Sequence, residues 1–200
     1  MTRVPPVERP SAAAQQELDR QLQAHGRVTN MKRTLAHSAP ALTALMTWYP
    51  LRDEVASFLG ERATTLFAHA VSTETGCLIC STFFRRMLVD AGEDPDRLVL
   101  DDRDAAVVAF GLELARNNSH VPRAAYDRLA SLLEPAQIVA LVAFGGMMIA
   151  TNVVNNALEV ELDEYLVPYR RARFGEMNAA RRGARRRRGC GRMEASCRTN

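Results

Sequence analysis

Residues 73–86 read Thr-Glu-Thr-Gly-Cys-Leu-Ile-Cys-Ser-Thr-Phe-Phe-Arg-Arg and place Cys77 and Cys80 at C-x-x-C spacing. Thr73 or Thr75 can cap a helix, because a threonine side-chain oxygen accepts a free N–H of the first turn. Apolar residues then recur at helical spacing, which predicts a helix over about residues 76–91. The sequence therefore predicts a cysteine pair at the start of a helix.

That position has chemical consequences for both thiols. In the first turn of a helix, Cys77 would face unpaired N–H groups and the positive end of the helix dipole, which stabilise an anion and lower a thiol pKa. Cys80 follows three residues later, so both sulfurs would share one face of the helix. Such a pair can cycle between a dithiol and a disulfide, and this is the chemistry the sequence favours.

Two other interpretations of the pair remain open. Free cysteines often act as small buried apolar side chains. A zinc site would need two more ligands at suitable spacing; Cys190 and Cys197 lie far away, and the histidines are scattered. The four histidines are His25, His37, His69 and His120. We therefore expect no metal and no cofactor.

The charge of the chain is divided between its two ends. Residues 170–200 carry 11 arginines and two glutamates, whereas the whole chain has a net charge of only +3. The body is thus acidic, so a nucleic-acid-binding surface on the folded part is not expected. The composition is rich in Ala, Leu and Val and only 6% aromatic, which favours an all-α fold.

The sequence also suggests a cellular compartment. No signal peptide is visible in the first residues, which are polar and contain prolines. Four cysteines in 200 residues do not form a disulfide scaffold. The most apolar run, residues 138–151, is short for a membrane span, so it predicts a core helix. We expect a cytoplasmic protein without a membrane segment.

The chain divides into four parts by pattern. Residues 1–10 are predicted to be disordered, residues 11–39 to form an N-terminal helical arm, residues 40–169 a helical domain, and residues 170–200 an Arg-rich disordered tail. The helices are expected at about residues 11–25, 28–39, 41–49, 52–59, 61–71, 76–91, 103–116, 122–132, 135–158 and 162–169. The segment Trp48-Tyr49-Pro50 is expected to close the third of these.

The longest of these helices, residues 135–158, is almost entirely apolar and should lie at the centre. Gly145 and Gly146 interrupt it at a cost of about 1 kcal/mol each relative to alanine, which predicts close approach of a neighbouring helix. Asn152, Asn155 and Asn156 end the apolar run. We expect these asparagines to cap carbonyls or to form hydrogen bonds across an interface.

Residues 40–168 resemble the AhpD-like (carboxymuconolactone decarboxylase) superfamily. The segments that carry the resemblance are Glu-Arg-Ala at 61–63, Phe-Ala-His-Ala-Val-Ser at 67–72, Cys-Leu-Ile-Cys at 77–80, Ile-Val-Ala-Leu at 138–141 and Thr-Asn at 151–152. The resemblance implies an AhpD-like helical bundle and a homo-oligomer. Its redox branch implies an alkylhydroperoxidase or disulfide reductase whose cysteines, here Cys77 and Cys80, react with a hydroperoxide or a protein disulfide and are restored by a dithiol reductant.

The chain departs from the motif of that branch at two positions. The branch places a glutamate where this chain has Thr65 and a histidine where it has Phe84. His69 lies one turn after Thr65, nearer the cysteines, and a histidine titrates near neutral pH. We therefore expect His69 to act as a substitute base, with Glu74 shaping the local field; the alternative is that His69 is a half-buried core residue.

The sequence thus predicts a thiol–disulfide oxidoreductase with Cys77, Cys80 and His69 as site residues. The helix start favours Cys77 as the low-pKa thiol, whereas the resemblance implies that Cys80 attacks the peroxide, so both assignments stay open. Trp48, Tyr49, Phe83 and Phe84 could form an apolar mouth. Two alternatives remain, a cofactor-free decarboxylase of the superfamily's other branch and a non-enzymatic helical oligomer.

Overall fold

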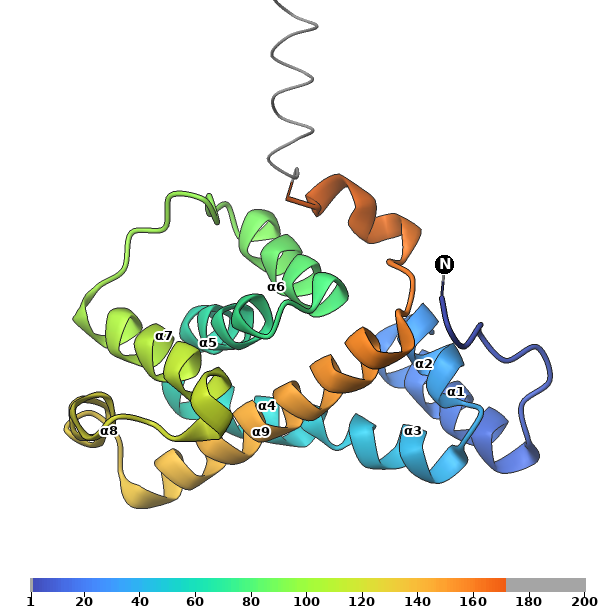
Figure 1. The fold of residues 1–200 in the computed structure, drawn as a ribbon, viewed down its shortest axis with the longest axis horizontal. Helices are drawn as coiled ribbons and strands as arrows, with labels where there is room; N and C mark the ends of the chain where they lie inside the picture. The colour runs from blue at the N-terminus through green and yellow to red at the C-terminus, as the bar shows by residue number, and fades with distance from the viewer. Residues whose placement is uncertain (1, 172–200) are drawn as a thin grey trace, which may run out of the picture. The chain divides into compact units, whose positions relative to one another are not determined.

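The computed structural model describes residues 2–171, of which residues 2–169 belong to one compact unit (Figure 1). The described part of this unit is all-helical. Its elements are α1 (Ala12–His25), α2 (Asn30–Leu35), α3 (Ala39–Met46), α4 (Trp48–Leu59), α5 (Glu61–Glu74), α6 (Leu78–Asp90), α7 (Asp102–Ala115), η1 (Asn117–Ser119), α8 (Arg123–Ala130), α9 (Pro135–Leu158) and η2 (Glu164–Tyr169). The predicted all-α fold is confirmed. The predictions for the tail, Cys190 and Cys197 included, lie outside the described residues.

Several helix ends follow from the capping residues that the sequence indicated. The hydroxyl of Ser11 accepts the N–H of Ala14 at 3.2 Å, and Gly26 ends α1 in the left-handed region at φ 71°. Asp101 caps α7 by accepting the N–H of Asp104 at 2.7 Å. Short polar side chains at these positions satisfy N–H groups that the helix leaves free.

Two predicted elements differ from the structure. The segment Trp48-Tyr49-Pro50 opens α4 rather than closing the preceding helix, because Pro50 falls in the first turn, where a missing N–H costs nothing. The last element, η2, is a 3-10 helix with Pro168 inside it.

Hydrogen bonds connect the N-terminal residues, for which the sequence predicts disorder, to the body. These residues form no helix, but the N–H of Arg3 donates to the carbonyl of Leu158 at 2.9 Å, and the N–H of Val7 donates to the carbonyl of Arg33 at 3.2 Å. Arg3 also forms an ion pair with Glu159 at 2.9 Å. These contacts supply backbone partners that the sequence pattern could not indicate.

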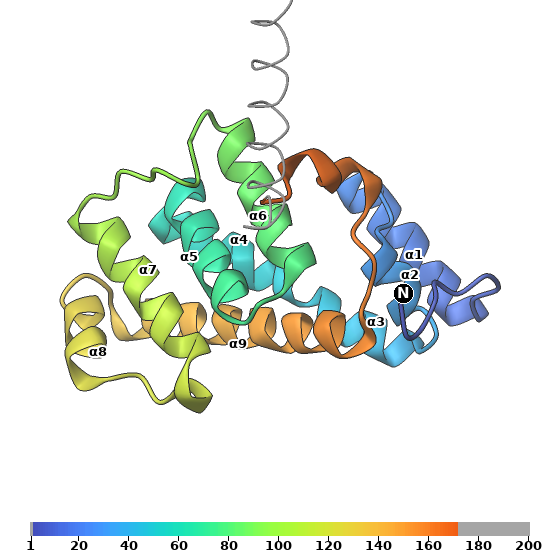
Figure 2. The ribbon, with the colours of Figure 1, turned by 45° about the horizontal axis from the view of Figure 1, so that its top comes forward.

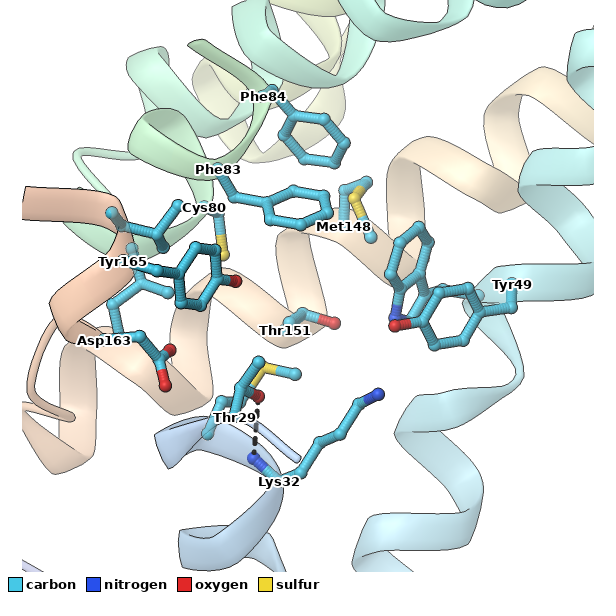
Figure 3. A pocket seen from close by; sticks show the side chains of 14 residues that line it. Thr29, Lys32, Tyr49, Cys80, Phe83, Phe84, Met148, Thr151, Asp163 and Tyr165 are labelled. Atoms are coloured by element: carbon cyan, nitrogen blue, oxygen red, sulfur yellow. Dashed lines mark hydrogen bonds between the residues drawn. The ribbon is translucent and has the colours of Figure 1, made fainter. Parts of the chain in front are cut away.

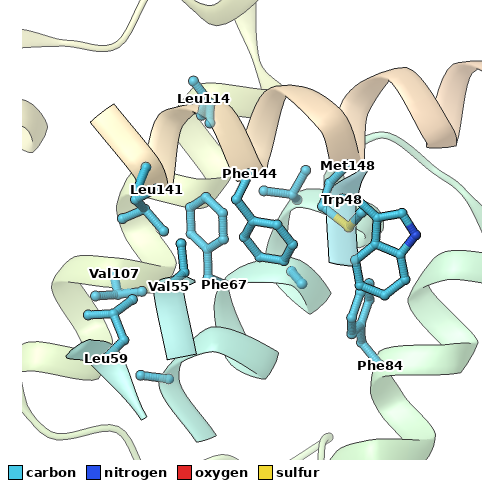
Figure 4. Close-up of a cluster of buried hydrophobic side chains, with 14 of the residues drawn as sticks. Trp48, Val55, Leu59, Phe67, Phe84, Val107, Leu114, Leu141, Phe144 and Met148 are labelled. Carbon is cyan, nitrogen blue, oxygen red and sulfur yellow. The ribbon is translucent and has the colours of Figure 1, made fainter. Parts of the chain in front are cut away.

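The core is built where α9 crosses α4, α5 and α7. Figure 2 shows α9 running from α8 at its start to the arm of α1–α3 at its end. Phe67 of α5 and Phe144 of α9 are fully buried, with ring centroids 5.9 Å apart (Figure 4). The central position predicted for α9 is confirmed.

The two glycines of α9 have different surroundings. A Cβ at Gly145 would lie against the side chain of Leu114 and 3.0 Å from Phe67. A Cβ at Gly146 would meet no atom within 4 Å. The predicted close approach is therefore confirmed at Gly145 and wrong at Gly146, which lies on the exposed side of the helix.

By length and composition alone, α9 could cross a membrane, and it is the one such helix among the described residues. Its buried side, which includes Ile138, Leu141 and Met148, packs inside the helical unit. The packing of this side against α4, α5 and α7 accounts for its apolar residues without a bilayer.

Candidate functional site

The two cysteines lie at the turn between α5 and α6. Cys77 is the N-cap of α6, with φ −77° and ψ 105°, and its sulfur accepts the N–H of Cys80 at 3.3 Å. The prediction that Thr73 or Thr75 caps this helix is wrong, since Thr75 instead donates to the carbonyl of Val71 at 3.0 Å. Cys77 thus lies one position before the first turn, where a helix N-terminus still stabilises a thiolate.

The end of α9 holds this turn in place through two asparagines. Asn152 donates to the hydroxyl of Thr75 at 2.7 Å, and Asn156 donates to the carbonyl of Thr75 at 2.9 Å. Asn152 is fully buried. These hydrogen bonds bear out the expectation that the asparagines cap carbonyls and bond across an interface, here the one between α9 and the α5–α6 turn.

A third asparagine of α9 contacts the sulfurs directly. The amide Nδ2 of Asn155 lies 3.2 Å from the sulfur of Cys80 and 3.9 Å from the sulfur of Cys77. Asn155 is 3% exposed, so these contacts are shielded from water. Sequence reasoning did not place Asn155 in the site; its only signal was a polar residue at helical spacing within an apolar helix.

The environment separates the pKa values of the two thiols. The pKa of Cys77 is lowered, first by the hydrogen bond from the Cys80 thiol and also by N–H donors of Cys80, Asn155 and Ile79. The pKa of Cys80 is raised well above its ordinary value by that same hydrogen bond and by burial. The pair therefore loses its first proton readily, and the two sulfurs share the proton that remains.

An apolar pocket opens beside Cys80 (Figure 3). Its cavity of about 60 Å³ is several times the room that one water molecule needs. Elements far apart in sequence line it, namely α2, α4, α6, α9 and the segment around η2. The lining residues are Thr29, Met31, Lys32, Trp48, Tyr49, Ile79, Cys80, Phe83, Phe84, Met148, Thr151, Asp163, Tyr165 and Leu166.

The four aromatic residues that the sequence proposed as an apolar mouth, Trp48, Tyr49, Phe83 and Phe84, all line this pocket. Cys80 faces the pocket and is 7% exposed, whereas Cys77 lies behind it and is fully buried. Only Cys80 of the pair can therefore meet a molecule in the cavity.

The other predicted site residues, His69 and Glu74, do not line the pocket. His69 is half-buried on α5. Its role as a base stays a prediction. Glu74 pairs with Arg116 at 2.8 Å, which lowers the pKa of Glu74.

Thr65 and Phe84 occupy the positions where the redox branch has a glutamate and a histidine, and both residues serve other purposes here. The Thr65 hydroxyl donates to the carbonyl of Glu61 at 2.8 Å, one turn back in the same helix. Phe84 is 3% exposed and contributes an apolar wall to the pocket. Within residues 2–171, no three His, Cys, Asp or Glu side chains gather as a metal ion would require.

The arrangement of helices is shared with several solved structures. The chain aligns with the debrominase Bmp8 at a TM-score of 0.70 and 15% identity, covering 83% of this chain and 95% of that one. It aligns with an uncharacterized peroxidase-related protein of Ralstonia eutropha, described as an alkylhydroperoxidase AhpD core, at a TM-score of 0.68 and 17% identity, covering 82% and 94%.

A second uncharacterized peroxidase-related protein, from Silicibacter, aligns at a TM-score of 0.63 and 17% identity, covering 80% of this chain and 90% of that one. A cysteine-to-alanine variant of Bmp8, solved in complex with 2,3,4-tribromopyrrole, matches at a TM-score of 0.69. No family model and no curated protein matches the sequence. At these identities the likeness establishes the AhpD-like fold, as the sequence resemblance predicted.

Proposed function

We propose that the protein is a thiol–disulfide oxidoreductase in which the Cys77–Cys80 dithiol reduces a small molecule bound in the apolar pocket. The observation that carries this proposal is the position of Cys80, whose sulfur lies at the pocket wall with the sulfur of Cys77 behind it. Both sulfurs are reached by one amide, that of Asn155. A substrate attacked by one sulfur therefore leaves the other in reach for the second step.

The order of events follows from which sulfur is accessible and which ionises first. Cys80 attacks, and its proton passes to the thiolate of Cys77. With a hydroperoxide ROOH, Cys80 becomes a sulfenic acid while the O–O bond breaks, and Cys77 returns the proton to the leaving alkoxide as ROH. The Cys77 thiolate then displaces hydroxide to form the disulfide. A dithiol reductant completes the cycle by reducing the Cys77–Cys80 disulfide to two thiols, and the reductant is oxidised to its own disulfide.

The size of the pocket favours a small oxidant over a protein disulfide. A protein disulfide would have to bring its own backbone to Cys80, which is 7% exposed. A hydroperoxide with a short apolar group needs only the cavity. An alkyl hydroperoxide is therefore the substrate class to test first.

A second candidate is the reductive removal of halogen from an aromatic ring. Five aromatic side chains line the pocket next to Cys80, and the fold is shared with a debrominase. Replacing a ring halogen by hydrogen uses two electrons and releases hydrogen halide, which oxidation of the same dithiol to a disulfide would balance. A 2-bromophenol tests this reaction, with free bromide as the readout.

We also propose that the chain forms a homo-oligomer through the outward side of α9. This helix has no charged residue between Pro135 and Leu158. Its exposed apolar positions alternate at spacings of three and four residues, and Val139 and Val153 are 69% and 58% exposed. They are Ala136, Val139, Ala143, Gly146, Ala150, Val153 and Ala157. Such a seam of small side chains matches its own copy, since two like helices can pack closely along it.

The decisive experiment for the redox function is a titration of the reduced protein with an alkyl hydroperoxide. We expect the mass to fall by two hydrogens, with a Cys77–Cys80 disulfide in the peptide map and one alcohol released per disulfide. A dithiol should reverse the change. If the hydroperoxide leaves the mass unchanged, the oxidoreductase assignment is wrong and the cysteine pair is structural, whether or not the protein converts a carboxylated lactone.

A further inference from the structure

The pocket beside Cys80 contains a buried cation. Lys32, the only lysine of the chain, lies on α2 and is 2% exposed. Figure 3 shows its amine reaching toward Tyr49, across the pocket from Cys80, and it lies 5.2 Å from the centre of the Tyr49 ring. Lys32 takes part in none of the ion pairs formed between described residues, all of which involve arginines.

Two acidic groups, Glu17 and Asp163, act on this ammonium electrostatically, and neither forms an ion pair with it. Glu17 of α1 raises the pKa of Lys32 but pairs with Arg20 and accepts from Gln21 at 2.9 Å. Asp163, which also lines the pocket, raises it too; one of its oxygens accepts the N–H of Asn30 at 2.9 Å, and the other is buried without a hydrogen-bond partner among the described residues. Burial outweighs both and lowers the pKa of Lys32 to about 8. A buried cation without a close partner is unfavourable, and a bound anion would relieve it.

A second donor in the pocket is also without a partner. The indole N–H of Trp48 is buried and forms no hydrogen bond with a described residue, and Trp48 is 6% exposed. Figure 4 shows its nitrogen on the side of the ring turned away from Phe144. An indole N–H and an ammonium only donate hydrogen bonds. Both therefore select for an acceptor on the ligand.

The aromatic side chains of the pocket wall favour a ligand with an aromatic ring. Phe83, Phe84, Tyr49 and Tyr165 line the cavity, and aromatic faces at such a wall stack on planar ligands. The enclosed volume of about 60 Å³ is smaller than the roughly 150 Å³ of a cavity that holds benzene, so a small ring would occupy the pocket together with its mouth, and a long chain would not fit. Cys80 lies at one side of this space and the amine of Lys32 at the other (Figure 3).

We propose that this pocket binds a small aromatic compound with an acidic ring O–H or N–H as its anion, with Lys32 as the counter-ion and the Trp48 indole as second donor. The inference deepens the proposed function, because it names the substrate class presented to Cys80. The anionic substituent lies at the Lys32 side, which leaves the opposite edge of the ring facing the sulfur.

The test is calorimetric binding of 4-nitrophenol and of its neutral methyl ether, 4-nitroanisole, to the full chain with Cys77→Ser and Cys80→Ser. This variant cannot cycle, so binding is measured apart from redox chemistry. We expect 4-nitrophenol to bind at least tenfold more tightly than the ether at neutral pH. Lys32→Met should remove this preference, and Arg33→Met, which changes an exposed neighbouring cation, should keep it.

A second measurement needs no change at Lys32. Because the chain has one lysine, labelled lysine yields a single side-chain resonance, which should shift when 4-nitrophenol is added and stay unchanged with the ether. Equal binding of phenol and ether, a preference that survives Lys32→Met, or equally tight binding of the aliphatic anion cyclohexanecarboxylate would each overturn the inference. Failure of the hydroperoxide titration with this preference intact would instead reject the proposed oxidant and keep the binding site.

Discussion

The side-chain amide of Asn155 donates to the sulfur of Cys80 at 3.2 Å across a separation of 75 residues. It joins the end of α9 to the start of α6 at the point where the cysteine pair meets the pocket. The same amide lies 3.9 Å from the sulfur of Cys77. One residue of the central helix therefore acts on both thiols at once.

Replacing Asn155 by alanine removes this donor. We expect Asn155→Ala to raise the pKa of Cys77, because the amide donates to the charged form of this thiol and stabilises it. The measurement is the ultraviolet absorbance of the thiolate as a function of pH, which needs no reagent to reach the buried Cys77. Asn156→Ala, from the same helix end without a sulfur contact, is the control. His69→Ala tests the predicted base in the same assay, and an unchanged thiol pKa there removes His69 from the mechanism.

Single cysteine variants separate the roles of the two thiols. In Cys77→Ser, hydroperoxide should oxidise Cys80 to a sulfenic acid that a dimedone-type reagent traps, since the pocket still reaches that sulfur. In Cys80→Ser, the remaining fully buried Cys77 should react at least tenfold more slowly. Mass spectrometry after a single addition of oxidant measures the extent of oxidation in both variants. The reverse pattern would make Cys77 the attacking residue.

The buried ammonium of Lys32 should lower stability below its folded-state pKa. Its pKa falls from 10.5 to about 8 on folding, so the unfolded chain binds more protons between these pH values and stability rises with pH there. Below pH 8 the whole cost is present. We therefore expect Lys32→Met to raise the free energy of unfolding at pH 7 by about 2 to 3 kcal/mol.

Urea unfolding at pH 7 and pH 10 checks this expectation. The stability difference between wild type and Lys32→Met should shrink at the higher pH, and Arg33→Met should show no such trend. A Lys32→Met protein that is less stable than wild type at pH 7 would mean that the ammonium is satisfied within the protein.

The same substitution, glycine to alanine, should change the stability in opposite directions at the two adjacent glycines of α9. Gly145→Ala forces a methyl group against Leu114 and Phe67 and should destabilise the protein by about 1 to 3 kcal/mol. Gly146→Ala meets open space within a single chain and, in an Ala143→Glu background in which the proposed seam cannot form, should stabilise it by up to about 1 kcal/mol. Thermal unfolding of the two variants side by side decides whether helix propensity or packing governs each site.

The outward seam of α9 should determine the oligomeric state. Ala143→Glu places a charge in the middle of the seam, and we expect it to yield monomers in sedimentation experiments. Ala44→Glu, the same change on the exposed side of α3, should leave the assembly intact. A wild-type chain that sediments as a monomer, or an Ala143→Glu assembly of unchanged size, would rule out this interface.

The sequence determined what depends on neighbours along the chain. Apolar spacing and capping residues such as Ser11 and Asp101 placed most of the helices, and the C-x-x-C placed two thiols at a helix start. Periodicity is a local signal, so it is readable without knowing which helices meet. It was less reliable at Trp48-Tyr49-Pro50, which opens a helix instead of closing one, and at Cys77, which caps a helix instead of lying in its first turn.

Tertiary structure decided which distant side chains share the site. Asn155 on α9 and Lys32 on α2 carry no local pattern that links them to Cys80, yet packing places Asn155 against its sulfur and Lys32 in the pocket beside it. Helix packing brings residues together through the shape of whole surfaces, which spacing along one segment does not encode. The cysteine pair was therefore visible in the sequence, whereas the donor that contacts it and the cation across the pocket became visible only in the fold.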